Sequence, residues 1–322
     1  MKVSGKVVAD AIAQKLKKEI KVLKIKPTLA IILAGEDPSS KIYVNFKIKR
    51  AKQIGINIKN FEFSKRQFKK CLETIQKLNA DNKVHGIIIQ YPVFKGWDFE
   101  ELISKIDSKK DVDGFREDSP FLGATAMGVW EMLTAFGLLE GFSKAEDLLK
   151  DKKIVLLGRG KTAGGPIKKL LESHGTKINV IHSKTENPDK EIKKADVVIS
   201  ATGRKNIINK NNLKRDVYVI GVGVGKEIVQ GKEKIYGDIY EKDVAKIAKL
   251  YCPTVGGIGP LTIVCLLKNL LEFDRIFLHF SHLGRRQPRL EQETVADLQI
   301  SAQIAPLLRL GSFRPLKAFL IP

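Results

Sequence analysis

The stretch Lys153-Ile-Val-Leu-Leu-Gly-Arg-Gly-Lys-Thr-Ala-Gly-Gly-Pro166 decides the fold class of this chain. Its apolar run, Ile154 to Leu157, is typical of a buried parallel strand. Gly158, Gly160 and Ala163 then follow the G-x-G-x-x-G/A spacing of a turn that brings a pyrophosphate to a helix N-terminus. The spacing alone fits an ordinary strand-to-helix turn equally well. The strand before it and the apolar-periodic helix after it favour a Rossmann-type NAD(P)-binding domain.

Strand and helix patterns alternate along the rest of the chain. They predict helices at 6–23, 40–54, 68–78, 99–106 and 128–139, and strands at 28–34, 57–63, 85–92, 153–157, 177–181, 196–201 and 217–221. The turn before the second helix carries Ser39 and Ser40, which are suited to cap it, and Gly55 is suited to end it. A loop rich in Gly and Pro, 251–262, opens a last helix that runs to about Leu271. The alternation predicts an α/β fold with parallel sheets and helices on both faces.

Composition limits the classes of protein that fit. A chain of 322 residues with 43% apolar and 29% charged residues is large enough for two domains with buried cores. No apolar run is long enough to span a bilayer, and the N-terminus lacks a signal-peptide pattern. The cysteines are too few and too scattered for a disulfide framework, and no metal site is predicted. We therefore expect a cytoplasmic protein.

The formal net charge of +21 has two interpretations. One is nucleic-acid binding, which would make this an RNA-binding protein on a degenerate enzyme fold. The other is a lysine-rich solvated surface that attracts small anionic ligands. The lysines are spread over many predicted helices, and no aromatic-interleaved RNA motif is present, so the second interpretation is favoured. Residues 273–322 differ in character, with six arginines and one lysine, and suggest no site.

The end of the second strand of the Rossmann half bears on the choice of cofactor. A site that prefers NAD usually places Asp or Glu about 20 residues past the glycines, on the ribose 2′-hydroxyl. This strand ends instead in His182-Ser183-Lys184, which offers a hydroxyl and a cation to a phosphate. Arg159, inside the glycine turn, adds a charge suited to bidentate phosphate contact. These residues favour NADP, with NAD as the alternative. Farther along, Gly203, Gly221, Gly223 and Gly225 follow strand ends and would leave room for a flat cofactor.

Several polar residues of the first half are unremarkable one at a time. Tyr43 and Lys47 lie four apart and share a helix face, Gln90 ends a strand, and Asp113 lies in a turn. In order, however, the motifs Tyr43-Val-Asn-Phe-Lys47, Gly86-Ile-Ile-Ile-Gln-Tyr-Pro92, Lys110-Asp-Val-Asp-Gly-Phe115, the glycine turn, His182-Ser-Lys-Thr185 and Pro253-Thr-Val-Gly-Gly-Ile-Gly-Pro-Leu-Thr262 resemble the bifunctional methylenetetrahydrofolate dehydrogenase/methenyltetrahydrofolate cyclohydrolase (FolD) family. The resemblance covers about residues 1–272.

The resemblance implies two α/β domains with a cleft between them, and a homodimer. Residues 1–120 would form a folate-binding catalytic domain, completed by the helix near 260–272. Residues 121–259 would form the Rossmann NADP-binding domain, and 273–322 an atypical extension. The implied activity oxidises 5,10-methylenetetrahydrofolate with NADP and hydrolyses the methenyl product to 10-formyltetrahydrofolate, within one-carbon metabolism. A polyglutamylated folate is the implied substrate.

The resemblance also implies roles for single residues. Lys47 would be the catalytic lysine and Tyr43 would stack on the folate. Gln90 would hold and tune Lys47, and Asp113 would hydrogen-bond the pterin ring. The remaining implied contacts are with folate at Tyr91, Val255, Gly256, Gly257, Ile258 and Gly259, and with NADP at Gly158, Arg159, Gly160, Ser183 and Val224.

This chain departs from the family pattern at several positions. Gly160 stands where the family usually has Ser, Gly221 where it has Asp, and Val255 and Ala126 where it has Pro. The segment from Phe115 to Thr125 is shorter. We expect these changes to bear on cofactor binding and domain closure more than on the catalytic residues. The alternatives are a monofunctional dehydrogenase of this family and another two-domain dehydrogenase, such as a shikimate-type enzyme.

Overall fold

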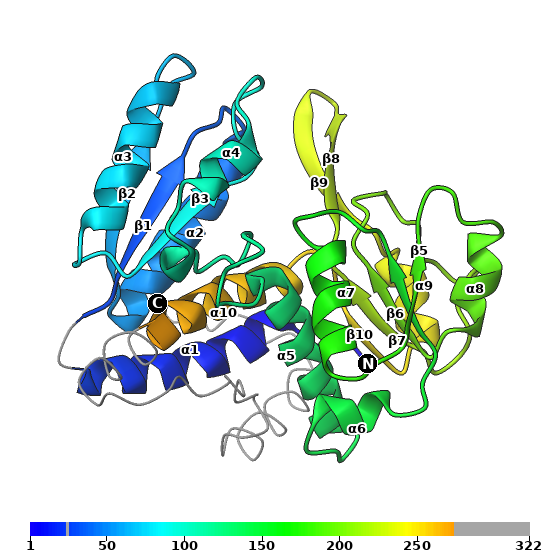
Figure 1. The fold of residues 1–322 in the computed structure, drawn as a ribbon. Helices are drawn as coiled ribbons and strands as arrows, with labels where there is room; N and C mark the ends of the chain where they lie inside the picture. Colours follow the sequence, from blue (N-terminus) through cyan, green and yellow to red (C-terminus); the bar gives the residue numbers. More distant parts are fainter. Residues whose placement is uncertain (24–25, 274–322) are drawn as a thin grey trace, which may run out of the picture. The chain divides into compact units, whose positions relative to one another are not determined.

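The computed structural model describes residues 1–23 and 26–273, so the distinctive tail from 274 to 322 lies outside the described residues. The described chain forms two compact units (Figure 1). A three-stranded unit comprises residues 12–128 and 262–273. A five-stranded unit comprises Met1–Ala11 and Val129–Leu261. The predicted α/β class is confirmed, since the larger sheet of each unit is parallel throughout.

The three-stranded unit has its most buried strands at the centre and on one side. Its strands are β1 (Thr28–Leu33), β2 (Asn57–Glu62) and β3 (Gly86–Gln90), in the order β2-β1-β3. Every residue of β1 and β3 is buried, as the continuous apolar runs predict. The main helices around this sheet are α2 (Pro38–Ile54), α3 (Phe68–Ala80) and α4 (Phe99–Ser104).

The start of α2 differs from the sequence prediction. The capping group is the Asp37 carboxylate, which accepts from the amides of Ser39 at 3.3 Å and Ser40 at 3.1 Å. Pro38 occupies the first turn, where its missing N–H costs nothing. Gly55 ends the helix as predicted, because its φ of 100° is in the left-handed region. This cap fixes the helix that carries Tyr43 and Lys47.

The five-stranded unit has the strand order β10-β7-β6-β4-β5. Its strands are β4 (Ile154–Leu157), β5 (Ile178–Ile181), β6 (Val197–Ser200), β7 (Tyr218–Gly221) and β10 (Leu250–Cys252), and its helices include α6 (Ala145–Leu149), α7 (Gly164–Ser173), α8 (Pro188–Lys194) and α9 (Glu241–Ile247). Chain order reverses beside β4, which is paired with both β5 and β6. A reversal of this kind opens a crevice at the carboxyl ends of the strands.

Besides the short helices α6, α8 and α9, two parts of this unit were not predicted from the sequence. Strand β10 lies in the segment assigned to the Gly/Pro-rich loop, and the amide of Val3 donates to the Tyr251 carbonyl at 2.8 Å, so residues near the N-terminus join this edge. The antiparallel hairpin β8 (Val224–Val229) and β9 (Lys232–Gly237) extends away from the sheet (Figure 1). It was missed because Gly225 was interpreted as cofactor space. A side chain there would instead meet the Tyr236 ring at 2.4 Å.

Three helices contribute residues to both units: α1 (Gly5–Val22), α5 (Ala124–Leu139) and α10 (Ile258–Phe273). The predicted helices at 6–23 and 128–139 and the last helix correspond to them, with α5 starting four residues earlier. Within the described ranges, no helix combines the length and apolarity needed to cross a membrane.

Candidate functional site: a buried lysine–carboxylate pair and a glycine turn

The three-stranded unit brings Tyr43, Lys47 and Asp113 together. Tyr43 and Lys47 lie one turn apart on α2, with the Lys47 ammonium nitrogen Nζ 5.1 Å from the centre of the Tyr43 ring. Lys47 is only 4% exposed, although α2 is otherwise rich in lysines that face solvent. Lys47 therefore differs from the other lysines of α2, because its side chain is buried in the unit and theirs face solvent.

Lys47 Nζ lies 3.9 Å from Asp113 Oδ2, and their side chains are 5% and 12% exposed. This distance is too long for a direct hydrogen bond, so the pair is held by charge alone. Burial lowers the pKa of Lys47, while the Asp113 carboxylate acts to raise it. Burial likewise raises the pKa of Asp113, against the effect of Lys47. The low polarity around the pair therefore favours a neutral lysine amine.

Gln90 and Tyr91 follow at the carboxyl end of β3. Gln90 is buried, and its Nε2 donates to the Tyr91 carbonyl at 2.7 Å. Within the described residues, Gln90 Oε1 is a buried acceptor without a hydrogen-bond partner, and the expected contact with Lys47 is not formed. Tyr91 is half-exposed, and its ring packs edge-on against Phe99 with centroids 5.0 Å apart. An unsatisfied buried acceptor beside an exposed aromatic ring suits a polar ring-shaped ligand.

The Asp113 loop is anchored by residues that the sequence did not single out. Lys110 is buried and donates to the carbonyls of Leu78, Asn79 and Asp81 at 2.9, 2.7 and 2.9 Å, so all three of its protons are used at the end of α3. In the sequence, Lys110 is only a lysine beside two aspartates, a pattern that also fits a solvated polar turn.

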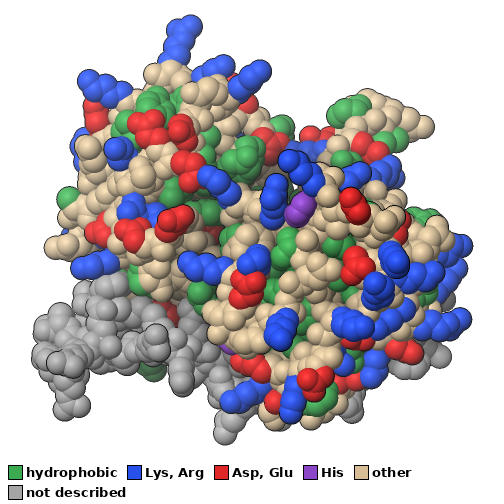
Figure 2. All heavy atoms as spheres, turned by 45° about the vertical axis from the view of Figure 1, so that its right-hand side comes forward, with side chains coloured by type: hydrophobic (Ala, Val, Ile, Leu, Met, Phe, Trp, Pro, Cys, Tyr) green, Lys and Arg blue, Asp and Glu red, His purple; other side chains and the backbone are tan. Residues whose placement is uncertain are grey.

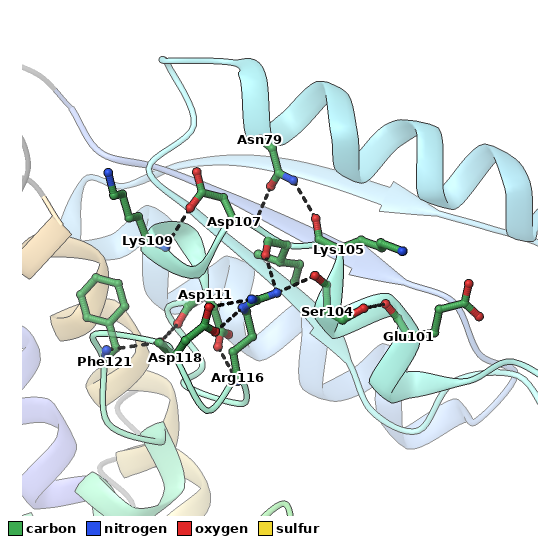
Figure 3. A network of polar contacts seen from close by, with 12 residues as sticks. Asn79, Glu101, Ser104, Lys105, Asp107, Lys109, Asp111, Arg116, Asp118 and Phe121 are labelled. Carbon is green, nitrogen blue, oxygen red and sulfur yellow. Dashed lines mark hydrogen bonds and ion pairs between the residues drawn. The ribbon is translucent and has the colours of Figure 1, made fainter.

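Arg116 holds the other side of this loop (Figure 3). Its guanidinium forms a bidentate ion pair with Asp118, with Nε donating to Oδ1 at 2.7 Å and Nη2 to Oδ2 at 2.8 Å. Nη1 donates to the carbonyls of Ser104 at 2.5 Å and Ile106 at 3.0 Å. Its amide donates to Asp111, whose buried carboxyl has a pKa raised to about 6 by burial. The short loop is thus fixed by charge-assisted bonds.

The five-stranded unit places the glycine turn between β4 and α7. Gly158 has a φ of 99°, and a side chain there would meet the Ala201 carbonyl at 2.5 Å. The tight helix–strand approach occurs at Gly164, where a side chain would meet the Gly158 carbonyl at 2.3 Å. Gly160 has open space around it. The sequence pattern therefore found the turn, but the close-packed third position is Gly164 rather than Ala163. A backbone cradle of this kind fits the pyrophosphate of NAD(P).

Exposed cations surround this turn on the two neighbouring strand ends. Arg159, Ser183 and Lys184 are all exposed. The Gly158 amide donates to the Ile181 carbonyl at 2.9 Å, which joins the two turns. His182 folds the second turn by accepting from the Lys184 amide at 3.2 Å through Nδ1. The arrangement offers a hydroxyl and two positive charges to a phosphate.

Asp238 fixes the neighbouring strand ends. It is fully buried, and its carboxylate accepts from the Ser200 hydroxyl at 2.8 Å, from the Thr202 amide at 2.9 Å and hydroxyl at 3.1 Å, and from the Gly223 amide at 3.2 Å. Val224, the next residue, is exposed. A side chain at Gly223 would meet Asp238 Oδ2 at 2.4 Å. Gly223 thus serves to admit this carboxylate.

The missing carboxylate at Gly221 has a steric explanation. A side chain there would meet Thr254 Oγ1 at 2.3 Å, so Thr254 occupies the space that a residue at 221 would need. Thr254 begins the loop of Val255, Gly256, Gly257, Ile258 and Gly259, the implied folate contacts. Val255 is exposed, and a side chain at Gly257 would meet the Pro253 carbonyl at 1.8 Å. This loop belongs to the five-stranded unit, whereas Lys47 and Asp113 belong to the other.

Surface charge is dispersed on the face that Figure 2 shows. Lysine and arginine side chains are scattered over it with carboxylates among them. This pattern lacks the single basic stripe expected of a nucleic-acid groove. In the described residues, no group of three or more metal-ligating side chains is assembled.

Comparisons with known proteins point to one family for both units. The sequence model of the tetrahydrofolate dehydrogenase/cyclohydrolase catalytic domain matches residues 3–113, and that of the tetrahydrofolate dehydrogenase/cyclohydrolase NAD(P)-binding domain matches residues 124–276. Bifunctional protein FolD 1 of Acinetobacter baylyi is 33% identical over 281 residues, which cover 85% of this chain and 94% of that protein. Bifunctional protein FolD of Rickettsia bellii is 36% identical over 282 residues, covering 85% and 98%.

Solved structures show the same similarity. The bifunctional FolD enzyme of Campylobacter jejuni has a TM-score of 0.77 at 30% identity, covering 85% of this chain and 98% of its own. The Trypanosoma brucei methylenetetrahydrofolate dehydrogenase-cyclohydrolase, complexed with NADP cofactor and inhibitor, has a TM-score of 0.79 at 26% identity, covering 87% and 98%.

Proposed function

This chain belongs to the tetrahydrofolate dehydrogenase/cyclohydrolase family, and we propose that it oxidises 5,10-methylenetetrahydrofolate with NADP and hydrolyses the product to 10-formyltetrahydrofolate. The observation that carries the proposal is the buried Lys47 beside Asp113, on a helix that also presents Tyr43. A buried lysine that serves only the structure usually bonds directly to a carboxylate or a carbonyl. Lys47 lies 3.9 Å from Asp113, which leaves its amine free for chemistry.

The oxidation depends on orientation. NADP, when bound, accepts the hydride that a nitrogen lone pair of the folate helps to expel. The chain's part is to hold both reactants, because this step needs alignment more than an acid or base. Tyr43 and Tyr91 supply ring faces for the folate, and Gln90 Oε1 supplies an acceptor for a ring N–H. Asp113 accepts from the pterin.

The hydrolysis depends on a proton acceptor. Water adds to the methenyl carbon, and a ring nitrogen then leaves, so a proton must move from the water to that nitrogen. Burial lowers the pKa of Lys47, so its neutral amine is available nearer to neutral pH than that of an exposed lysine. Lys47 takes the proton from water and returns it to the departing nitrogen. Asp113 limits how far the pKa falls, which keeps the amine basic enough for this role.

The cofactor proposal rests on residues of the glycine turn. Gly158 and Gly160 line the turn, and Arg159 and Ser183 would hold the 2′-phosphate that distinguishes NADP from NAD. Val224 would pack on the cofactor. The T. brucei relative complexed with NADP supports the choice.

The proposal extends to substrate, assembly and compartment. Val255, Gly256, Gly257, Ile258 and Gly259 would line the folate pocket, and the net charge of +21 suits a polyglutamate tail. The family resemblance supports a homodimer, which light scattering of the eluted protein would test. The three cysteines are free and buried, which supports the cytoplasm.

One assay tests the proposal directly. Purified protein is incubated with methylenetetrahydrofolate and either NADP or NAD, while absorbance follows reduced cofactor and chromatography follows formyltetrahydrofolate. We expect both products, and faster reduction with NADP. Reduced cofactor without accelerated hydrolysis would leave a monofunctional dehydrogenase. Well-folded protein that forms neither product would contradict the enzyme proposal, and salt-dependent RNA binding would then be measured.

A further inference from the structure

Asn269 of α10 is a fully buried amide in a helix whose other buried residues are mostly apolar. Its Nδ2 donates to the carbonyl of Val112 at 2.9 Å and to that of Leu122 at 2.9 Å. Both neighbours are acceptors, so the orientation of this amide is fixed by its surroundings. Val112 directly precedes Asp113, and Leu122 ends the loop that begins there. One side chain thus ties both ends of the Asp113 loop to α10.

Helix α10 also contacts Tyr43, which together with Lys47 and Asp113 forms what we call the lysine cluster. Thr262 lies seven residues before Asn269, or about two helical turns, and hydrogen-bonds the side chain of Tyr43. The packing is also close at Leu270, the residue that follows Asn269. A side chain at Gly86 would meet Leu270 Cδ1 at 2.7 Å and Val112 Cγ1 at 2.8 Å. Helix, strand and loop are therefore in contact at the residue before Asp113, which leaves little room for this backbone to shift.

The other side chains that anchor the loop act farther from Asp113. Lys110 holds the start of the motif on α3, and Arg116 holds the part after it on the carbonyl end of α4 (Figure 3). Asn269 is the side chain that bonds to the peptide group joining Val112 to Asp113, while the backbone amide of Ala124 donates to the Asp113 carbonyl at 3.2 Å on the other side. The orientation of that peptide sets the direction in which the Asp113 side chain leaves the backbone, and with it the distance to Lys47.

We propose that Asn269 is a positioning residue for the proposed folate chemistry, holding Asp113 beside Lys47 through the Val112 carbonyl. It contacts neither member of the pair. The proposal goes beyond the proposed function and rests on it for the meaning of the pair, although the geometry can be tested without substrate.

The groups that act on Lys47 make the test specific. Asp113 is the charged group that acts on it, Tyr43 faces it from its own helix, and burial opposes its charge. The charge of Lys47 in turn acts to lower the pKa of Asp113, and Asp113 interacts electrostatically with Asp111. Because the Asp113 carboxylate raises the pKa of Lys47, movement of Asp113 away from the lysine must lower that pKa further. A loss of stability alone would not produce this change.

The experiment measures the titration of Lys47 by NMR of protein labelled with ¹³C-lysine, with the Lys47 signal assigned by its absence in Lys47→Met. Asn269→Leu removes the donor and keeps the branched shape of the side chain. The matched control is Asn79→Leu, since Asn79 also clamps backbone of this unit, donating to the Lys105 carbonyl at 2.7 Å and accepting from the Asp107 amide at 2.9 Å. Asn269→Ser, which keeps a hydroxyl donor, serves if the leucine variant does not fold.

We expect the Lys47 midpoint to move to lower pH in Asn269→Leu, and less far in Asn269→Ser, with no movement in Asn79→Leu. Where the wild type turns over methenyltetrahydrofolate, kcat for hydrolysis falls roughly ten- to a hundredfold, and KM rises because the displaced Asp113 is also the proposed acceptor for the pterin. A folded Asn269 variant with an unchanged Lys47 midpoint would overturn the proposal. A wild type without turnover would instead overturn the proposed function, and the NMR comparison would still decide the role of Asn269.

Discussion

The lysine cluster of the three-stranded unit and the glycine turn of the five-stranded unit differ in how they hold charged side chains. The cluster places two opposite charges where water is scarce, with Lys47 and Asp113 only 5% and 12% exposed. The turn keeps its charges, Arg159 and Lys184, in solvent and presents backbone to its ligand. Burial in the first case changes the proton affinity of a side chain. Exposure in the second case leaves Arg159 and Lys184 as fixed charges. Their position relative to the turn would determine which cofactor binds.

The difference predicts how each region responds to substitution. Side chains of the cluster act through chemistry that depends on their titration, so their replacement alters rates and pH profiles. Residues of the turn act through shape and charge, so their replacement alters cofactor affinity.

Lys47→Met is expected to lower hydrolysis of methenyltetrahydrofolate by roughly 10²- to 10⁴-fold, the range for loss of a positioned acid–base group. Because burial lowers the pKa of Lys47 and the neutral amine accepts the proton, wild-type hydrolysis should rise with pH through that lowered pKa, and the variant should lose this rise. Stopped-flow absorbance of the methenyl substrate across pH measures both. The exposed Lys52 on the same helix provides the control Lys52→Met. Unchanged hydrolysis in Lys47→Met would point to a dehydrogenase that lacks the second activity.

Asp111→Asn tests whether the cluster influences stability through titration. Burial raises the pKa of Asp111 to about 6, above its ordinary value near 3.8, so the folded chain holds this proton more tightly than the unfolded chain. The stability it contributes is present at low pH and is lost as pH rises from about 4 to about 6, on the order of 3 kcal/mol. Asparagine cannot titrate, so the variant should lack this fall.

Urea unfolding at several pH values between 4 and 7 measures the effect. The matched control is Asp118→Asn, whose carboxylate is exposed and paired with Arg116, which lowers its pKa. Because the pKa of Asp118 is below its ordinary value, its contribution to stability is lost only as pH falls below about 4, so Asp118→Asn should keep the wild-type pH profile between 4 and 7. Parallel pH profiles for wild type and Asp111→Asn would show that the buried carboxyl is not protonated in this window.

Arg159→Ala is expected to weaken NADP binding roughly ten- to a hundredfold and NAD binding much less, because a charge-assisted bond to a phosphate contributes about 1.5–3 kcal/mol. Fluorescence titration with each cofactor measures the two dissociation constants. Arg215→Ala is the control, since Arg215 is exposed just before the amino end of β7, at the opposite edge of the sheet. Equal losses for NADP and NAD would mean that Arg159 does not read the 2′-phosphate.

The two regions also differ in how far the sequence could predict them. The glycine turn was found from a local pattern, because strand, turn and helix are contiguous in the chain. Tyr43 and Lys47 share one helix, but Asp113 comes from a separate loop, and only the order of motifs predicts that it meets them. Asn269 and Asp238 have no such signal, since a single polar residue in a mostly apolar helix or beside a hairpin forms no pattern of its own. Their partners lie 157 and 38 residues away, as for Val112 and Ser200.

The smallest effect is expected at Gly160, and it separates the two glycines of the turn. A side chain at Gly160 meets nothing within 4 Å, so Gly160→Ser should change unfolding free energy by no more than about 0.5 kcal/mol. Its new hydroxyl could donate to a phosphate and tighten NADP binding by roughly fivefold, for about 1 kcal/mol. Gly158→Ser is the matched opposite, because a φ of 99° and the Ala201 carbonyl at 2.5 Å leave no room for a side chain. It should lose roughly 1–3 kcal/mol of stability together with cofactor affinity. Thermal unfolding and NADP titration of both variants measure this contrast. Similar losses of stability and NADP affinity in the two variants would mean that both glycines are needed for the shape of the turn, and that Gly158 alone does not set it.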